Sequence, residues 1–249
     1  MRLLAIDVGN TSTAACLWND GRVTRAVHCD GGFEEAAAVC RRILASSRVS
    51  AVAYASVVPE ADGAWRAFAS GAGLEFRTVD VRRFRAATGI RLDTPRPGCI
   101  GADRLADAAG AVERHGAPVA VMDFGTAFTA SAVDSSLVWR GGAIAPGLPF
   151  LCDYLAEKTA KLPRIRLSRS GSGVPPPGRT TVAAMRFGAV AGFRGMVRET
   201  AAELSRALGE KLKIVATGGF AGAVLAGSDI EAAIDPDLTL YGTGLICAS

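Results

Sequence analysis

The chain has 249 residues, of which 49% are hydrophobic and 21% are charged, and its formal net charge at pH 7 is +4. A chain of this length can bury one large core or two of ordinary size. The low net charge and the scattered arginines disfavour a nucleic-acid-binding protein, and no uncharged apolar run is long enough to predict a membrane-spanning helix.

Strand and helix signals alternate in the first half of the chain. After an apolar hairpin pattern at 3–18, apolar spacing predicts strands at 23–28, 49–59 and 75–81 and helices at 33–45 and 63–70. Residues 89–100 carry Pro and Arg without a period, so we expect a loop there. It leads into Gly101-Ala102-Asp103-Arg104, after which helical spacing resumes as far as Glu113.

The second half repeats this order. A second hairpin pattern at 119–134 is followed by a predicted strand at 137–139 and a glycine-rich turn at 141–147. Residues 168–179 include three consecutive prolines and predict an irregular, flexible loop. A long Ala-rich helix at 182–208, a strand at 213–216 and the turn Thr217-Gly218-Gly219 come next. Alternating strands and helices predict an α/β fold with packed layers.

The two hairpin patterns are variations on one theme. LLAIDVGNTSTAACLW at 3–18 and VAVMDFGTAFTASAVD at 119–134 are apolar runs that end in Asp-x-Gly, followed by hydroxyl residues and a second apolar run. Glycine has no β-carbon, so backbone N–H groups can close on a phosphate while Asp and Thr supply a carboxylate and hydroxyl donors. Because the two units lie 116 residues apart, we predict two similar domains, 1–116 and 117–249, whose turns grip a nucleoside triphosphate.

Each motif also has a purely structural interpretation. Asp and Gly are ordinary turn formers, so a single Asp-x-Gly turn is weak evidence for phosphate binding. The second copy and the late Thr-Gly-Gly turn, which would lie against adenine or ribose, favour a nucleotide. Asp103 and Arg104 can be a helix cap and a surface ion pair, or a general base beside a guanidinium that holds an anion. The residues alone leave both open.

The cysteines and the first residues favour a reducing compartment. The six cysteines form no C-x-x-C pair, which disfavours a zinc site or a disulfide framework. The chain begins directly with a strand and a glycine turn, without the segments of a secretory signal. We therefore expect a cytoplasmic protein with free thiols.

Taken together, the Asp-x-Gly turns and Thr217-Gly218-Gly219 resemble the phosphate and adenosine turns of the actin, hexokinase and acetate kinase superfamily. The duplicated ribonuclease-H-like domains of that superfamily bind ATP in the cleft between them. More specifically, the chain resembles type III pantothenate kinases. Four ordered motifs carry this resemblance, DVGNT at 7–11, GADR at 101–104, DFGTAFT at 123–129 and GGAIAPG at 141–147, with weaker similarity at 56–59, 155–163 and 181–185.

The resemblance implies ATP-dependent phosphorylation of the terminal hydroxyl of pantothenate, the first step of coenzyme A biosynthesis. Asp103 would be the general base, and an ordinary carboxylate is already ionised at neutral pH. Arg104, with the backbone of Gly101 and Ala102, would hold the carboxylate and amide of pantothenate. The residues implied to bind the substrate are Thr94, Gly101, Ala102, Asp103, Arg104 and Thr181.

The resemblance also implies a nucleotide site and two cation sites. Asp7 would act through Mg²⁺, and Asp123 would sit at a potassium or ammonium site. The residues implied to bind ATP are Asp7, Val8, Gly9, Asn10, Thr11, Ser12, Thr13, Ala14, Thr126, Gly218 and Gly219. Such enzymes are homodimers with pantothenate near the subunit interface, and neither a nucleic acid nor a membrane is implied as a partner.

Three residues depart from the family pattern. Ala14 stands where a Lys is usual, Thr94 stands nearest to the place of a usual Tyr, and Phe128 replaces a small or hydroxyl residue, either as an ordinary core residue or with an effect on the cation site or interface. Two alternatives therefore stay open: a kinase for another small hydroxy acid, and a catalytically weak regulatory protein that binds a partner. The retained motif carboxylates favour an active kinase.

Overall fold

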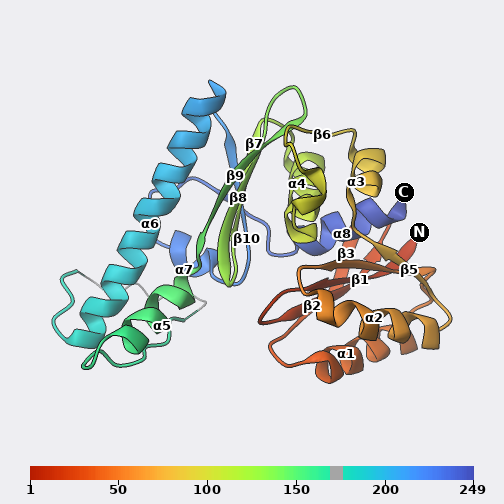
Figure 1. The fold of residues 1–249 in the computed structure, drawn as a ribbon, viewed down its shortest axis with the longest axis horizontal. Helices are drawn as coiled ribbons and strands as arrows, with labels where there is room; N and C mark the ends of the chain where they lie inside the picture. Colours follow the sequence, from red (N-terminus) through yellow and green to blue (C-terminus); the bar gives the residue numbers. More distant parts are fainter. Residues whose placement is uncertain (169–175) are drawn as a thin grey trace. The chain divides into compact units, whose positions relative to one another are not determined.

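The computed structural model describes residues 1–168 and 176–249, so most of the loop predicted at 168–179 lies outside the described residues. The chain divides into two compact units (Figure 1). Unit 1 consists of Met1–Gly116, Leu137–Trp139 and Asp237–Ser249, and unit 2 of Ala117–Ser136 and Arg140–Pro236. In the described part of the chain, no helix is long and apolar enough to cross a membrane.

Unit 1 is built on a five-stranded sheet with the strand order β3-β2-β1-β4-β5. The strands are β1 (Arg2–Val8), β2 (Thr13–Asn19), β3 (Arg22–Cys29), β4 (Ala51–Ser56) and β5 (Glu75–Thr78). The pairs β1–β2 and β2–β3 are antiparallel, whereas β1–β4 and β4–β5 are parallel. The helices are α1 (Phe33–Ala45), α2 (Pro59–Gly71), α3 (Val81–Thr88), α4 (Ala102–His115) and α8 (Leu238–Ala248).

Alternation along β1 separates the two faces of this sheet. Leu4, Ile6 and Val8 belong to a buried cluster that includes residues of α1 and α2. Side chains alternate between the faces of a strand, so Asp7 points to the opposite face. That face carries α8, with α4 packed behind it (Figure 1). The first motif carboxylate is thus directed away from the main apolar cluster.

Unit 2 repeats the same order with later strands, β9-β8-β7-β10-β11. They are β7 (Val119–Phe124), β8 (Ala127–Val133), β9 (Val138–Pro146), β10 (Lys213–Thr217) and β11 (Ala233–Ile234). β7 pairs antiparallel with β8 and parallel with β10, which pairs parallel with β11. The repeated topology confirms the predicted duplication of a ribonuclease-H-like sheet.

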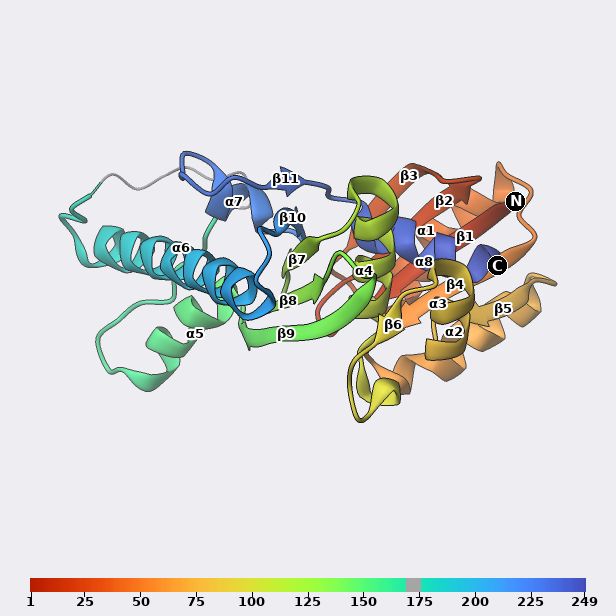
Figure 2. The ribbon, with the colours of Figure 1, turned by 90° about the horizontal axis from the view of Figure 1, so that it is seen from above.

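Three helices cover one face of the second sheet: α5 (Leu148–Lys158), α6 (Thr181–Leu208) and α7 (Ala221–Leu225). Figure 2 shows α5 and α6 running beside the strands. Phe124, Phe128 and Phe193 form an aromatic centre here, with ring centroids 5.4 to 6.0 Å apart. Phe128 is fully buried, so it is a core residue.

Between α3 and α4, β6 (Arg91–Leu92) and a 3₁₀ turn (Pro97–Cys99) lie in the segment predicted as a loop. β6 pairs in parallel with the first residues of β9, Val138 and Trp139. Both of these residues pack with unit 1.

The predicted turn at 141–147 is wrong, because β9 continues through most of it. A β-carbon on Gly142 would overlap the carbonyl oxygen of Ala130 and lie 2.6 Å from its carbonyl carbon. The glycine therefore lets β9 approach β8, and the motif extends a strand rather than ending one.

Helices α3 and α8 were not predicted. In α3 the Asp80 carboxylate caps the helix by accepting a hydrogen bond from the N–H of Arg83 at 2.8 Å, and Phe84 is fully buried. α8 packs on α4, where a β-carbon on Gly242 would overlap the carbonyl of Ala106. The division at residue 116 places α8 in the second domain, whereas this close glycine packing places it in unit 1.

Candidate active site

The first Asp-x-Gly turn follows β1. The N–H of Gly9 donates to the carbonyl of Ser12 at 2.9 Å, and Asn10 and Thr11 are exposed at the tip. Among the other residues implied to bind ATP, Val8, Thr13 and Ala14 are buried in the flanking strands. The turn therefore presents polar side chains and backbone to solvent while its strands anchor it.

Ala14 lies directly opposite Asp7 in the antiparallel register. Residues opposite each other on such a pair share one face of the sheet. Ala14 is 8% exposed, so the position beside the Asp7 carboxylate holds a methyl group where the family pattern has an ammonium.

The second Asp-x-Gly turn follows β7 and packs closely against Gly147. The N–H of Gly147 donates to the carbonyl of Thr126 at 3.0 Å. A β-carbon on Gly147 would lie 2.5 Å from the carbonyl oxygen of Gly125, so no side chain fits there. The 141–147 motif thus ends by holding the turn that carries Thr126.

The Thr217-Gly218-Gly219 turn packs on this second turn. Gly218 has a φ of +85°, and a β-carbon on it would lie 2.7 Å from the backbone N and C of Phe124 and overlap Asp123 Oδ1. The N–H of Phe220 donates to the carbonyl of Phe124 at 3.1 Å. Two motifs that are far apart in sequence therefore form one glycine-lined surface in unit 2.

Polar side chains flank Asp123 on its own face of the second sheet. Asp123 is opposite Thr129 on β8 and Thr217 on β10. Both threonines are buried, at 9% and 1% exposure. A carboxylate between two hydroxyl groups is an all-oxygen donor set, which suits a hard cation.

Asp103 and Arg104 lie in the first turn of α4. Asp103 Oδ1 accepts a hydrogen bond from the N–H of Arg104 at 2.7 Å, and a β-carbon on Gly101, the residue before the helix, would overlap that oxygen. The carboxylate satisfies one N-terminal N–H of the helix, but the N-cap residue is Gly101, so Asp103 is not the cap.

Both side chains are partly buried, which disfavours the surface ion-pair interpretation. Burial raises the pKa of Asp103, and the backbone hydrogen bond and the charge of Arg104 oppose this shift. Burial also lowers the pKa of Arg104, opposed by the carboxylates of Asp103 and Asp107. The pKa of Asp103 is therefore raised above the ordinary aspartate value on which the sequence-based expectation relied.

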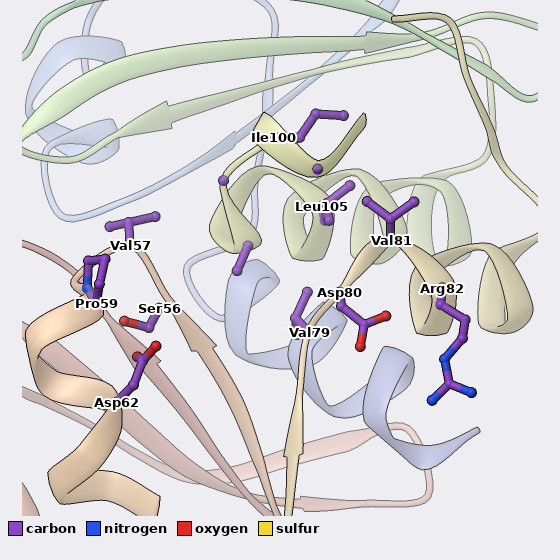
Figure 3. Close-up of a pocket in the computed structure, with 13 residues that line it drawn as sticks. Ser56, Val57, Pro59, Asp62, Val79, Asp80, Val81, Arg82, Ile100 and Leu105 are labelled. Carbon is purple, nitrogen blue, oxygen red and sulfur yellow. The ribbon is translucent and has the colours of Figure 1, made fainter. Parts of the chain in front are cut away.

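A cavity of about 660 Å³ opens beside this helix start within unit 1 (Figure 3). Ser56, Val57 and Pro59 lie on one wall, and Val79 to Arg82 on another. The remaining lining comes from Asp62, Gly98, Ile100, Gly101, Ala102 and Leu105. The walls follow the carboxyl ends of the parallel strands β4 and β5, where α/β proteins bind ligands.

Val57 joins the first turn to this cavity. Its N–H donates to the carbonyl of Val8 at 3.1 Å. Its Cγ1 atom lies 3.4 Å from the position of a β-carbon on Gly101. Within unit 1, the residues that follow Asp7 are therefore linked through one residue to the GADR segment.

The remaining candidates have separate places. Thr94 is half-buried after β6, and its Oγ1 accepts from the N–H of Arg96 at 3.4 Å. Thr181 is exposed at the first position of α6. Asp7, Thr94 and the GADR segment belong to unit 1, and Asp123, Thr126, Thr181, Gly218 and Gly219 to unit 2.

Sequence reasoning missed three residues of the candidate site: Val57, Gly147 and Trp139. The first two lie within motifs quoted for the resemblance, but their roles rest on close packing. Trp139 lies under Arg104, whose Cζ is 5.2 Å from the centroid of its ring. No local signal indicated this contact.

The carboxylate of Asp7 fits a magnesium site better than a metal site with several protein ligands. Among residues 1–168 and 176–249, no group of three or more His, Cys, Asp or Glu side chains is placed to hold a metal ion. Mg²⁺ characteristically takes one or two carboxylates together with water and substrate phosphates. The single half-buried carboxylate of Asp7 beside a glycine turn suits that chemistry.

Comparison with known proteins yields matches along nearly the whole chain. A family model described as type III pantothenate kinase matches residues 3–203. The type III pantothenate kinase of Akkermansia muciniphila is 36% identical over 242 residues, which cover 97% of this chain and 96% of the relative.

Two solved structures share the fold at low sequence identity. A Campylobacter jejuni protein described as a Baf family transcriptional activator has a TM-score of 0.62 at 18% identity, covering 98% of this chain and 96% of its own. The activator of 2-hydroxyisocaproyl-CoA dehydratase from Clostridium difficile, solved with bound ADPNP, has a TM-score of 0.56 at 12% identity, with 100% and 93% covered. Both likenesses concern the fold.

Proposed function

The chain belongs to the type III pantothenate kinase family, and from this premise we propose that it transfers the γ-phosphoryl group of ATP to the terminal hydroxyl of pantothenate, the first step of coenzyme A biosynthesis. One observation carries the proposal beyond the family match. A carboxylate and a guanidinium that are both partly buried, Asp103 and Arg104, follow one another at the start of α4. Gly101 and Ala102 of the same segment line the cavity.

Asp103 is the general base of the proposed reaction. The hydroxyl oxygen of pantothenate attacks the γ-phosphorus, the bond from that phosphorus to the β,γ-bridging oxygen breaks, and ADP leaves. The hydroxyl proton passes to the carboxylate of Asp103, whose Oδ1 is held by the N–H of Arg104. Positioning and charge neutralisation supply most of the catalysis in phosphoryl transfer.

Arg104 binds the carboxylate of pantothenate. A guanidinium stays charged even where burial lowers its pKa, and it presents a fork of donors that matches a carboxylate. The backbone of Gly101 and Ala102 completes the contacts with the amide. Thr94 and Thr181 contribute further to substrate binding, by analogy with the family.

Three glycine turns bind the nucleotide in this proposal. Asn10, Thr11 and Thr126 donate to the triphosphate, and Gly218 and Gly219 lie against the adenosine. The close packing of Gly147 and Gly218, where a side chain would overlap backbone, is what a fixed phosphate-binding surface requires. Asp7 would hold Mg²⁺, which neutralises phosphate charge when it is bound.

We assign a monovalent cation, potassium or ammonium, to Asp123. Support comes from the hydroxyl-bearing neighbours in register, Thr129 and Thr217. Because this donor set lies under the Gly218 turn, a cation there would stabilise the turn that faces the nucleotide. Activity that rises with potassium or ammonium over sodium, and an Asp123→Asn variant that loses this rise, are the expected results.

We propose that the active protein is a homodimer in the cytoplasm, where free thiols persist; all six cysteines are free. Large exposed apolar side chains on β9 and α5 support the dimer. Ile144, Phe150 and Tyr154 are 67%, 51% and 61% exposed. Phe150 and Tyr154 are four residues apart on α5 and therefore share one face of the helix. Phe150→Asp should yield a monomer in sedimentation velocity, whereas a dimeric variant would contradict the assignment.

Two alternatives remain to be separated by experiment. Ala14 and Thr94 favour a kinase for another small hydroxy acid, and the fold shared with a protein described as a transcriptional activator favours a regulatory role. The protein should be incubated with ATP, Mg²⁺ and potassium together with pantothenate or a panel of other hydroxy acids. Phosphorylated pantothenate as the main product supports the proposal, whereas another phosphorylated acid overturns its substrate.

If no product forms, thermal unfolding with and without ATP distinguishes a kinase for another acceptor from a protein without turnover. A ligand at 100 times its dissociation constant adds roughly 2.7 kcal/mol to the free energy of unfolding. Stabilisation by ATP without product indicates another acceptor. A folded protein that ATP does not stabilise indicates a role without catalytic turnover.

A further inference from the structure

The Arg104 side chain is held from more than one side. Its Cζ lies 5.2 Å from the centroid of the Trp139 ring. Asp103 precedes it, and Asp107 follows one helical turn later. Asp107 is 2% exposed and accepts a hydrogen bond from Thr239 Oγ1 of α8 at 2.7 Å. The guanidinium therefore lies over an aromatic face and is stabilised by the charges of two carboxylates, each held by a hydrogen bond.

The setting of Trp139 makes it a rigid support. Its side chain is 5% exposed, its carbonyl accepts from the N–H of Asp93 at 3.0 Å, and it pairs with Leu92 in the β6–β9 register. An indole ring attracts a cation placed over its face, and this attraction grows when water is excluded. Trp139 thus limits the directions in which the Arg104 guanidinium can point.

The indole N–H of Trp139 is a second, independent observation. Trp139 Nε1 is buried and has no hydrogen-bond partner among the described residues. A buried donor without an acceptor costs free energy and calls for an explanation. Trp18 Nε1 shares this property, so the unpaired donor alone is not specific. At Trp139 it coincides with the stacked Arg104, the proposed ligand of the substrate carboxylate.

We propose that Trp139 is a substrate-specificity residue, whose ring fixes the Arg104 guanidinium for a carboxylate and whose indole N–H donates to an acceptor oxygen of the same acidic substrate. This inference rests on the proposed function of Arg104. It explains how acidic acceptors are selected: the guanidinium supplies charge, and the indole supplies a fixed plane and one further donor. A neutral analogue loses the first interaction and gains little from the second.

Steady-state kinetics of three variants test the proposal, with pantothenate and its neutral primary amide as acceptors. Trp139→Phe keeps an aromatic face and removes the N–H, Trp139→Leu removes both, and Trp18→Phe is the matched control. In Trp139→Phe we expect KM for pantothenate to rise about fivefold, the loss of one hydrogen bond. In Trp139→Leu we expect a rise of at least twentyfold, with the preference for pantothenate over the amide largely lost.

A merely structural role would not produce this pattern. KM for ATP and kcat should stay within twofold of wild type in both Trp139 variants, and Trp18→Phe should match wild type for pantothenate. An unchanged KM for pantothenate in Trp139→Leu overturns the support of Arg104, and an unchanged KM in Trp139→Phe overturns the donor role. If wild type forms no phosphopantothenate, the proposed function fails, and the inference fails with it.

Discussion

Gly218 packs directly on Asp123: a β-carbon on this glycine would overlap the carboxylate oxygen Oδ1 and lie 2.7 Å from the backbone of Phe124. The third glycine turn and the second Asp-x-Gly turn are therefore one surface, although 95 residues separate Asp123 from Gly218. A substitution at either residue should affect the other turn.

Gly218→Ala should weaken both stability and ATP binding. The new methyl group meets backbone rather than a flexible side chain, so Phe124 or the turn must shift, at a cost of roughly 1–3 kcal/mol. The matched control is Gly227→Ala, because Gly227 also has a positive φ, +66°, but has open space around it. Urea unfolding should show a larger loss in Gly218→Ala, and KM for ATP should rise in that variant alone.

Asp103→Asn should lower kcat by about 10² or more, the usual contribution of a positioned base. Asn can still accept the hydrogen bond of the Arg104 N–H, so the helix start should persist, as circular dichroism would show. Near-native turnover in this variant would remove Asp103 from the mechanism.

The same variant should be more stable than wild type at neutral pH. Because burial raises the pKa of Asp103 in the folded state, ionising this group costs folding free energy. The difference should be absent below the ordinary aspartate pKa of about 3.9, grow as pH rises through the raised pKa, and then stay constant. Thermal unfolding across pH measures it, and a wild type that gains stability relative to the variant over this range would contradict the sign.

The pH profile of kcat/KM for pantothenate should also reflect the titration of Asp103. Activity requires the ionised carboxylate, so it should fall as pH decreases through the raised pKa of Asp103. The midpoint of this acid limb should lie above the ordinary value of about 3.9. Comparison with the residual activity of Asp103→Asn identifies the group, because the limb should disappear there.

Ala14→Lys should strengthen ATP binding. The position is opposite Asp7 on β2, and an ammonium there adds one charge-assisted contact to phosphate, about 1.5–3 kcal/mol, or roughly tenfold or more in affinity. Ala14 is 8% exposed, so the longer Lys side chain must extend past its buried surroundings before its ammonium can reach a phosphate. Ala14→Gln supplies similar length without charge, so a gain in both variants would refute the electrostatic explanation.

The local parts of this fold could be predicted from the sequence. Helix α1 at Phe33–Ala45 matches the apolar spacing, and both hairpins follow from apolar runs broken by glycine. The 141–147 segment could not, because its glycines serve a close strand approach at Ala130 that only the partner strand defines.

The motifs of the site could be predicted from the sequence, but the burial and the electrostatics around them could not. Residues 101–104 could be identified from their order, whereas the raised pKa of Asp103 depends on burial by distant segments. The stacking of Arg104 on Trp139 joins helix α4 to the first residues of strand β9 through long-range packing. Periodicity and spacing carry no information about such contacts.

The decisive measurement is phosphoryl transfer from ATP to pantothenate by the wild-type protein. Purified wild-type protein should be supplied with Mg²⁺, ATP and pantothenate in potassium, ammonium or sodium salts, and the products identified by mass spectrometry. We expect 4′-phosphopantothenate and ADP in equal amounts, formed faster with potassium or ammonium. A folded protein that hydrolyses no ATP and forms no phosphopantothenate in any of these salts would overturn the proposed function.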